Sequence, residues 1–500
     1  MPARRTATAG APVIRFVEVR PGAYRDSVAL MQVSRDLTDL DGVSAVLVAM
    51  ATELNLDMLV SMGFDRPLKA GPNDMVVAIA AEDDEVLARA RIVLEKALRG
   101  EHEGRARGLT GGAGTADGLA QPVARITAGA LNGATLALVS VPGPYAFPEA
   151  VDALDGGLPV MIFSDNMPLE QEVWLKAAAA QRGLLVMGPD CGTALVAGVG
   201  LGFANVVRPG TVGIVAASGT GAQQLMCLLD AANVGISHCL GVGGRDLSAV
   251  VGGGSTLQAL DLLGADPATE IVVVLSKPPD PAVAELISHR ASALSKPVVI
   301  GLPGDTFPDL TAVAAAVLDA VGQPRPAWPR WTPSNPLPRR SGALRGLYAG
   351  GTLRDEALSI ARERLGGISD DPGAFGHVLV DFGDDRFTLG RAHPMIDPTL
   401  RADQLGRDLA DPATGVVLVD VVLGHGAHPS PATSIAEVVG EAAATGEILP
   451  PVVAALIGTE TDPQGLELQA QLLVDAGVRV FLSHAEAVHV ALHLLTGESP

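Results

Sequence analysis

Short apolar runs and longer amphipathic segments alternate along most of the chain. The runs at 212–217 and 416–423 are almost purely apolar, and a loop of small and polar residues follows each of them. An apolar run of roughly four to eight residues is typical of a strand that is buried on both faces, as in parallel sheets. The alternation therefore predicts an α/β fold with several doubly wound parallel sheets of the Rossmann or flavodoxin type.

Changes in composition divide the chain into four folded units and two connectors. Residues 99–121 are glycine-rich and lack periodicity, which indicates a flexible linker. Residues 324–340 hold six prolines together with Trp328 and Trp331. We expect an extended connector that neither donates to a sheet nor continues a helix, with its tryptophans packed on a neighbouring domain. The folded units are expected at 1–98, as an N-terminal α/β domain, and at 122–209, 210–323 and 341–500.

The strongest candidate binding site is a pair of glycine-rich loops in the 210–323 unit. One loop joins a strand to the start of a helix, and the other follows the very next strand. Unpaired amides and the positive end of a helix both favour phosphate or carboxylate. The alternative is a structural turn that binds nothing. The residues expected to bind are Ser218, Gly219 and Thr220 in the first loop and Gly243, Gly244 and Arg245 in the second.

Similar strand-end loops occur in the neighbouring units. Asn166 and Asp190 follow two strands of the 122–209 unit, and Gly383 and Gly424 follow two strands of the 341–500 unit. The carboxyl ends of parallel strands lie along one edge of a sheet, where open α/β folds bind their ligands. We therefore expect these residues to line a cleft that binds a phosphate-bearing ligand and a small carboxylate.

Three side chains are candidates for catalysis, and two more for metal binding. His425 and His428 could donate to phosphate or act as a general acid, unless loop hydrogen bonds occupy them. Cys191 stands at a strand end, although no neighbour in the sequence lowers the pKa of its thiol. Asp384 and Asp385 could bind Mg²⁺ through their carboxylates, or could cap the following helix instead.

The net charge and the composition of the chain exclude some classes of binding partner. The 35 basic and 56 acidic side chains give a formal net charge of −21, which opposes binding to nucleic acid or to an anionic membrane. Local amides and a few arginines must then hold any phosphate. Three cysteines are too few for a disulfide framework, and no apolar run reaches the ~18 residues of a membrane span. We expect a cytoplasmic protein.

Several motifs together resemble a known family. The stretch GATLALVSVPGPYAFPEAVDALDGGLPVMIFSDNMPLEQEV, with MGPDCGTA, resembles the back half of the CoA-binding domain of the succinyl-CoA synthetase α subunit. GIVAASGTGAQQ and GVGGRDL resemble the ligase domain of that subunit, and VDFGDDR with VVLVDVVLGHGAHPSPA resembles the ligase domain of the β subunit. The order of these units and the run GPDCGTALVAGVGLGFANVV resemble the FdrA family of acyl-CoA-synthetase-like proteins, over about residues 13–495.

The resemblance implies a function. It implies phosphate binding at the serine-glycine-threonine and two-glycine loops, with CoA or Mg²⁺ as cofactor candidates. It also implies a subunit of oxamate carbamoyltransferase, which interconverts oxalurate plus phosphate with oxamate plus carbamoyl phosphate, working with other subunits in a homo- or hetero-oligomer. Two alternatives stay open: an ADP-forming acyl-CoA ligase subunit with a separate ATP-grasp chain, and a non-catalytic protein that binds CoA or phosphate.

One departure from the synthetases bears on mechanism. Their α ligase domain carries a phosphohistidine in the loop after its last strand, whereas LPGDTFPDLTAV, which follows Gly301 here, holds no histidine. No part of the chain matches an ATP-grasp domain either. The sequence therefore predicts that phosphate reacts where it is bound, without a phosphohistidine relay.

Overall fold

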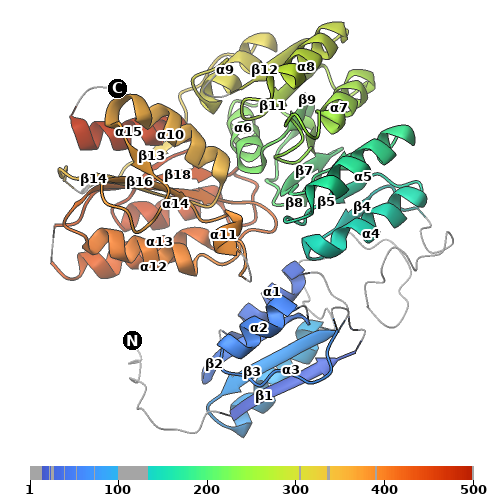
Figure 1. Ribbon diagram of the computed structural model, residues 1–500. Coiled ribbons are helices and arrows are strands. Elements are labelled where there is room, and N and C mark those ends of the chain that lie inside the picture. Colours follow the sequence, from blue (N-terminus) through green and yellow to red (C-terminus); the bar gives the residue numbers. More distant parts are fainter. Residues whose placement is uncertain are drawn as a thin grey trace. The chain divides into compact units, whose positions relative to one another are not determined.

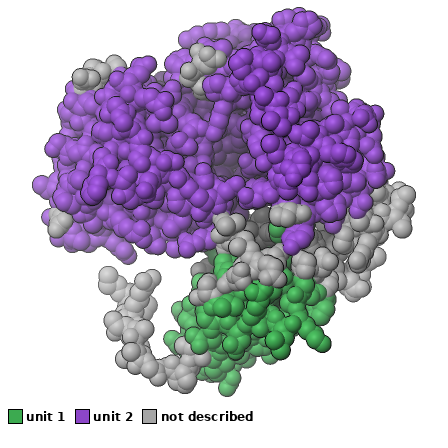
Figure 2. Space-filling model, viewed as in Figure 1, with its two compact units in different colours: residues 1–132, 140–142 green, residues 133–139, 143–500 purple. Residues whose placement is uncertain are grey.

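The computed structural model divides the chain into two compact units (Figure 2). One comprises residues 1–132 with 140–142, and the other comprises residues 133–139 with 143–500. The structure describes residues 14–98, apart from 22, 24–26, 39, 52 and 72–73, and residues 133–497, apart from 303–305, 335–337, 389–390 and 447. The expected linker at 99–121 lies outside the described residues.

The N-terminal unit is a three-stranded antiparallel sheet in the order β1-β3-β2. All residues of its central strand are buried, because helices cover both faces of the sheet. Val77 and Ile79 pack with the residues of α1 and α3, whereas Val76 and Ala78 pack with α2. The strands lie close to the expected apolar runs, but the sheet differs from a doubly wound one in its antiparallel pairing. The elements are β1 (Ile14–Arg20), α1 (Ser27–Thr38), β2 (Val43–Met50), α2 (Glu53–Ser61), β3 (Met75–Ala81) and α3 (Asp84–Leu98).

The second unit begins with a small parallel sheet in the order β4-β5-β6. Its strands are short and mostly buried, and the loops that follow them carry Asp165, Asn166 and Asp190. The elements are β4 (Ala137–Val139), α4 (Gly143–Asp155), β5 (Val160–Ile162), α5 (Leu169–Gln181) and β6 (Val186–Met187).

A six-stranded sheet follows, in the order β12-β11-β9-β10-β7-β8. The strands β9 to β12 are parallel and doubly wound, as the apolar runs predict. The hairpin β7–β8 was expected in the 122–209 unit, yet it joins this sheet through antiparallel pairing with β10. The elements are β7 (Thr193–Val196), β8 (Val199–Gly202), β9 (Pro209–Ala216), α6 (Gly219–Ala231), β10 (Ile236–Gly241), α7 (Gly254–Ala265), β11 (Ile271–Leu275), α8 (Pro281–Ala293), β12 (Val298–Gly301) and α9 (Leu310–Ala320).

The third sheet of this unit has seven strands in the order β13-β19-β18-β17-β14-β16-β15. Helices α10 and α15 cover one face, and α12 and α13 cover the other (Figure 1). The elements are β13 (Arg330–Trp331), β14 (Ala343–Tyr348), α10 (Gly351–Leu365), β15 (Ile368–Ser369), β16 (His377–Asp381), α11 (Asp385–Thr388), α12 (Thr399–Ala410), β17 (Thr414–Val422), α13 (Pro431–Ala443), β18 (Val452–Ile457), α14 (Leu466–Asp475), β19 (Arg479–Phe481) and α15 (His484–Thr496).

The proline-rich segment corrects one expectation. Arg330 and Trp331 form β13 and pair antiparallel with β19, so the segment does donate to a sheet. Pro329 takes part as an acceptor, because its carbonyl oxygen binds the amide of Leu482 at 3.0 Å. The Trp331 Nε1 donates to Glu467 Oε2 at 2.9 Å. Non-proline residues between prolines thus remain free to occupy the edge of a sheet.

A buried polar network joins the second and third sheets of this unit. Asp462 Oδ1 accepts the amide of Val206 at 2.7 Å, and Oδ2 accepts Asn205 Nδ2 at 2.8 Å. The Asn205 Oδ1 in turn accepts Gln223 Nε2 of α6 at 3.1 Å. The side chains of Asn205, Gln223 and Asp462 are buried, so each hydrogen bond is made away from competing water. The network fixes α6 against the end of β18.

Candidate functional site

Helix α6 begins in the expected serine-glycine-threonine loop. Ser218 is its N-cap, and Ser218 Oγ accepts the amide of Gly221 at 3.1 Å. The same hydroxyl lies 2.7 Å from Thr352 Oγ1 in the first turn of α10. A pair of hydroxyls therefore links the starts of two helices that come from different sheets.

Helix α10 approaches α6 so closely that one glycine is required. A Cβ atom on Gly350 would lie 2.3 Å from Thr220 Cγ2. We call residues 218–221 and 350–352 the helix junction. Neither helix has an acidic residue in its first turn, and the nearby negative charges are those of Asp355, further along α10, and Asp381, at the end of β16. Within the described residues, no acceptor binds the amides of Gly219, Thr220, Gly351 and Thr352.

Basic side chains add to the positive potential at the junction. Lys277 follows β11, and its Nζ lies 3.8 Å from the position that a Cβ would take on Gly351. Lys277 is about half exposed and pairs with Asp355 Oδ2 at 2.5 Å, and Arg354 Nη1 pairs with Asp355 Oδ1 at 3.1 Å. Asp355 thus holds two cations close to the start of α10 and offsets one of their two positive charges.

Asp381, at the end of β16, faces the start of α10. Its Oδ2 lies 2.7 Å from the position that a Cβ would take on Gly351. The pKa of Asp381 is raised to about 6, mainly by desolvation; nearby Asp420 also raises the pKa, whereas a backbone hydrogen bond and Arg354 lower it. Its Oδ1 accepts the amide of Gly383 at 2.9 Å. The Gly383 amide, expected to bind phosphate, is therefore already occupied by Asp381.

The raised pKa of Asp381 predicts a pH-dependent stability. The folded state holds this proton more tightly than the unfolded chain, so its stabilising effect is present below pH 3.8 and is lost as pH rises through about 6. Asp381→Asn removes this titration. Between pH 4 and pH 7.5, we expect wild type to lose up to about 3 kcal/mol more unfolding free energy than the variant. Urea denaturation at both pH values measures the difference, and equal losses would contradict it.

The loop after β17 does not present a free amide. The Gly424 amide donates to Gln464 Oε1 at 3.0 Å, and Gln464 Nε2 donates back to the Gly424 carbonyl at 2.8 Å. The His425 amide donates to the Ala204 carbonyl at 2.8 Å, and the residue is exposed. His428 Nδ1 accepts the amide of Ser430 at 2.9 Å. These contacts agree with the alternative expectation, in which loop hydrogen bonds occupy His425 and His428 and the residues stabilise the fold.

A second cluster combines the loops after β5, β6 and β10. Asn166 and Asp190 adopt φ values of 53° and 57°, in the left-handed region that side chains other than glycine seldom adopt. Gly243 has a φ of 86°, and a Cβ there would lie 2.4 Å from the Pro189 carbonyl oxygen. Gly244 lies open, with no atom within 4 Å of its Cβ position. The structure thus brings Asn166, Asp190, Gly243, Gly244 and Arg245 together, as the sequence predicts for strand-end loops.

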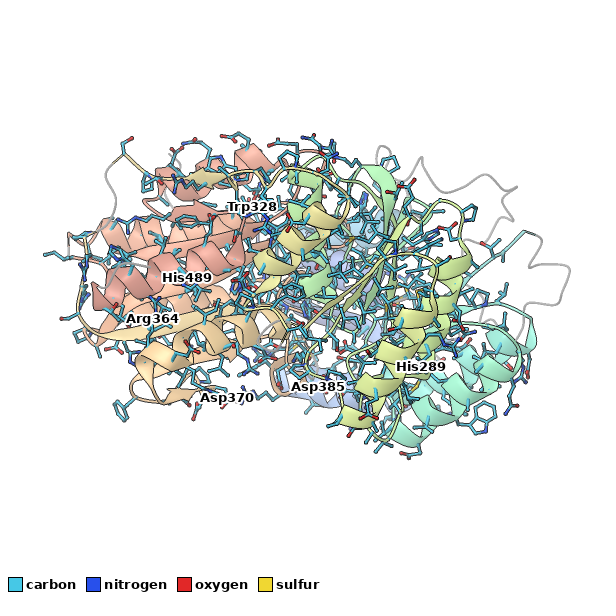
Figure 3. All side chains as sticks on the ribbon, turned by 90° about the horizontal axis from the view of Figure 1, so that it is seen from above. His289, Trp328, Arg364, Asp370, Asp385 and His489 are labelled. Carbon is cyan, nitrogen blue, oxygen red and sulfur yellow. The ribbon has the colours of Figure 1, made fainter. Side chains whose placement is uncertain are left out.

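The charges in this second cluster are coupled. The pKa of Asp190 is raised to about 7, mainly by desolvation; nearby Asp165, Asp385 and Asp381 also raise the pKa, and Arg245 lowers it. Asp385, labelled in Figure 3, lies at the start of α11, and desolvation raises the pKa of its carboxyl as well. A cation or an N–H donor at this edge would relieve the crowding of carboxylates.

Two expected roles find little support in the geometry. Cys191 is buried, its Sγ contacts the Thr193 carbonyl at 3.5 Å, and burial raises the pKa of the thiol, so a reactive thiolate is disfavoured. Asp384 Oδ1 accepts the amide of Arg386 at 3.0 Å, which matches the capping alternative. Among the residues that the structure describes, no group of three or more His, Cys, Asp or Glu side chains is arranged to hold a metal ion.

The sequence reasoning missed four residues at the site. Thr352, Lys277 and Asp381 surround the helix junction, as described above. His393 Nε2 lies 2.7 Å from the Cβ position of Gly383, and desolvation lowers the pKa of this imidazole to about 4. A signal for Thr352 was present, because Gly350, Gly351 and Thr352 repeat the strand, glycine, hydroxyl and helix pattern of the 218–221 loop.

Two family models match parts of the chain. Residues 347–494, which include the α10 part of the junction, match the family described as CoA-ligase. Residues 13–113 match a family described as AllF, heavy metal-associated domain. No cysteine lies in residues 13–113, so this part of the chain offers no thiolate to a soft metal ion.

Among the described residues, no helix is both long and apolar enough to cross a membrane.

Three relatives illustrate the similarity. The chain is 28% identical to the malate–CoA ligase subunit alpha of Methylorubrum extorquens, over 50% of this chain and 77% of that protein. The acetyl-coenzyme A synthetase 1 structure from Ca. Korarchaeum cryptofilum is 18% identical and covers 72% of this chain and 82% of its own, with a TM-score of 0.30. The uncharacterized protein YahF of Escherichia coli strain K12 is 38% identical, over 92% of this chain and 95% of that protein.

The α/β architecture and the CoA-ligase match confirm the expected fold class. The similarity to YahF extends over 92% of this chain and 95% of that protein. The chain therefore belongs to the same family as YahF, the FdrA family of acyl-CoA-synthetase-like proteins.

Proposed function

We propose that the helix junction binds the phosphate group of a small acyl or carbamoyl phosphate, in a multi-subunit enzyme that transfers this group to or from a small carboxylate. The specific reaction proposed is that of oxamate carbamoyltransferase, in which oxalurate and phosphate give oxamate and carbamoyl phosphate. The observation that carries the proposal is the 2.7 Å contact between Ser218 Oγ and Thr352 Oγ1, which joins two helix starts whose amides lack acceptors in the described structure.

The chemistry of the reaction suits such a site. Phosphate attacks the carbamoyl carbon of oxalurate, the bond from that carbon to the oxamate nitrogen breaks, and the nitrogen takes up a proton. Negative charge develops on the reacting oxygens, so fixed amides and cations stabilise the transition state more than the separated reactants. The amides of the junction and the Lys277 ammonium are such groups. Asp381, with its pKa near 6, could hold the proton that the leaving nitrogen needs.

A second function has its own support. The match of residues 347–494 to CoA-ligase and the similarity to a malate–CoA ligase α subunit favour an acyl-CoA ligase that works with a separate ATP-grasp chain. Such an enzyme would also bind phosphate at the junction, but it would form an acyl-CoA and consume a nucleoside triphosphate. The two functions can therefore be distinguished by their products, which are carbamoyl phosphate for the transferase and an acyl-CoA for the ligase.

The test is to co-express the chain with the products of its neighbouring genes and to assay phosphorolysis of oxalurate. We expect carbamoyl phosphate to form, and Ser218→Ala with Thr352→Ala to lower its rate by about 10- to 100-fold through the loss of hydrogen bonds to a charged group. The control is Ser292→Ala with Thr38→Ala, because both residues are exposed and each hydroxyl donates to a carbonyl of its own helix. Formation of an acyl-CoA without carbamoyl phosphate would overturn the carbamoyl transfer, and an unchanged rate would overturn the site.

A further inference from the structure

We propose that Arg245 binds the carboxylate of the substrate, and that the buried pair Glu172 and Lys176 on α5 positions it. The inference rests on the proposed function, because it names the part of the substrate that a group other than the helix junction recognises. The substrate class is a small carboxylate in which the carboxylate carbon is bonded to an amide group, as in oxamate.

The positioning device is a buried network of charges. Lys176 is 6% exposed and Glu172 is 1% exposed, values that are unusual for these residue types unless they are paired. Lys176 Nζ donates to Glu172 Oε1 at 2.9 Å, to Asp246 Oδ1 at 2.8 Å and to the Val242 carbonyl at 2.9 Å. All three N–H bonds of the ammonium are thereby used. The network joins α5 to the loop between β10 and α7.

Asp246 anchors the far end of this network. Its Oδ2 accepts the amide of Thr256 at 3.0 Å and the hydroxyl of Thr256 at 2.7 Å, at the start of α7. Asp246 is fully buried, so it cannot rotate without leaving these donors unpaired. The backbone of the preceding residue, Arg245, is therefore fixed, and the Arg245 side chain projects from a fixed position.

Glu172 then holds the Arg245 side chain by charge. Its second oxygen, Oε2, lies 2.9 Å from Arg245 Nε but accepts no hydrogen bond, and Arg245 Nη2 donates to the Met167 carbonyl at 2.9 Å. A guanidinium has five N–H bonds, and the Met167 carbonyl accepts one of them. Within the described residues, Arg245 makes no other ion pair, although its side chain is 45% exposed. The terminal nitrogens Nη1 and Nη2 therefore keep N–H bonds that can be donated to the two oxygens of a planar carboxylate.

The surroundings favour one kind of carboxylate. Asp165, Asp190 and Asp385 interact electrostatically with one another, and Arg245 offsets the charge of Asp190 and Asp385. A simple dianion would be repelled by these carboxylates. A monocarboxylate with an adjacent amide could place its charge on Arg245 and offer its N–H bonds to the acidic side chains.

The experiment is isothermal titration calorimetry of the full chain with oxamate and, separately, with inorganic phosphate. We expect Arg245→Gln to weaken oxamate binding by about 10- to 100-fold, the usual effect of losing a charge-assisted hydrogen bond, and to leave phosphate binding unchanged. Glu172→Gln should weaken oxamate binding by a smaller factor, because the neutral amide still fills the space but no longer holds the guanidinium by charge. Arg290→Gln is the matched control, because Arg290 is 43% exposed and pairs with an exposed aspartate.

Kinetics of the assembled enzyme separate positioning from folding. Glu172→Gln should raise the KM for oxamate without changing the KM for carbamoyl phosphate, and Arg245→Lys should recover part of the affinity that Arg245→Gln loses. A general loss of structure would change both KM values. Unchanged oxamate affinity in Arg245→Gln, with phosphate binding intact, would overturn this inference alone. A wild-type chain that binds no phosphate would instead contradict the proposed function.

Discussion

Gly350→Ala is expected to lower the rate of phosphate-dependent transfer by at least about 100-fold, because displacing a reacting group by about 1 Å has effects of this size. The backbone of Gly350 has φ −141° and ψ 126°, which alanine adopts readily, so the effect is steric. The new Cβ would lie between 2.3 and 2.7 Å from three atoms of the Thr220 side chain. Helices α6 and α10 must then separate, and the two sets of amides can no longer contact one phosphate.

The measurement is the rate of the assembled enzyme at saturating oxalurate and varied phosphate. Gly440→Ala is the matched control, because it lies within α13 and its Cβ would meet no atom within 4 Å. The control should keep full activity and gain slightly in stability, since alanine favours helices over glycine. Full activity in Gly350→Ala would show that the spacing of the two helix starts is irrelevant to the reaction.

Glu356→Ala is expected to reduce the free energy of unfolding by about 3 to 5 kcal/mol, the range found when one partner of a buried ion pair is removed. Glu356 Oε2 contacts His484 Nδ1 on α15, and Oε1 accepts the amide of Leu310 at the start of α9 at 2.5 Å. Both side chains are buried, so the variant leaves His484 Nδ1 and the Leu310 amide without a partner. Glu356 thus ties α10 to helices of both large sheets.

Urea denaturation of the full chain measures this effect. Glu363→Ala is the control, because Glu363 lies on the same helix and is exposed, and its change in stability should stay within about 0.5 kcal/mol. A similar small change for Glu356→Ala would mean that the contact with His484 contributes little to the fold.

The central strands of the large sheets could be predicted because they are buried on both faces. Val416 to Leu423, for example, is apolar except for Asp420, and it forms most of β17. Local pattern could not predict the pairing of β7 with β10 or of β13 with β19. These pairings depend on partners far along the chain, and short edge strands carry little periodicity of their own.

The sequence was enough to predict which loops form the candidate site, but not the contacts of each residue in those loops. Strand ends in a parallel sheet lie along one edge, which is why Asn166 and Asp190 lie close together, whereas Arg245 joins them from a second sheet. The occupation of the Gly424 amide was not predictable, because it depends on Gln464, 40 positions away, whereas Asp381 occupies the Gly383 amide through a local contact. The pairing of Ser218 with Thr352 spans 134 positions in the sequence, and it too depends on how two sheets pack.

The central claim is that one phosphate is bound where α6 and α10 meet. Its most direct measurement is a crystal structure of the full chain grown with inorganic phosphate. We expect a phosphate within hydrogen-bond distance of the amides of Gly219 or Thr220 and of Gly351 or Thr352, with the Lys277 ammonium turned towards it. A phosphate bound elsewhere, with these amides left in solvent, would contradict binding at the helix junction.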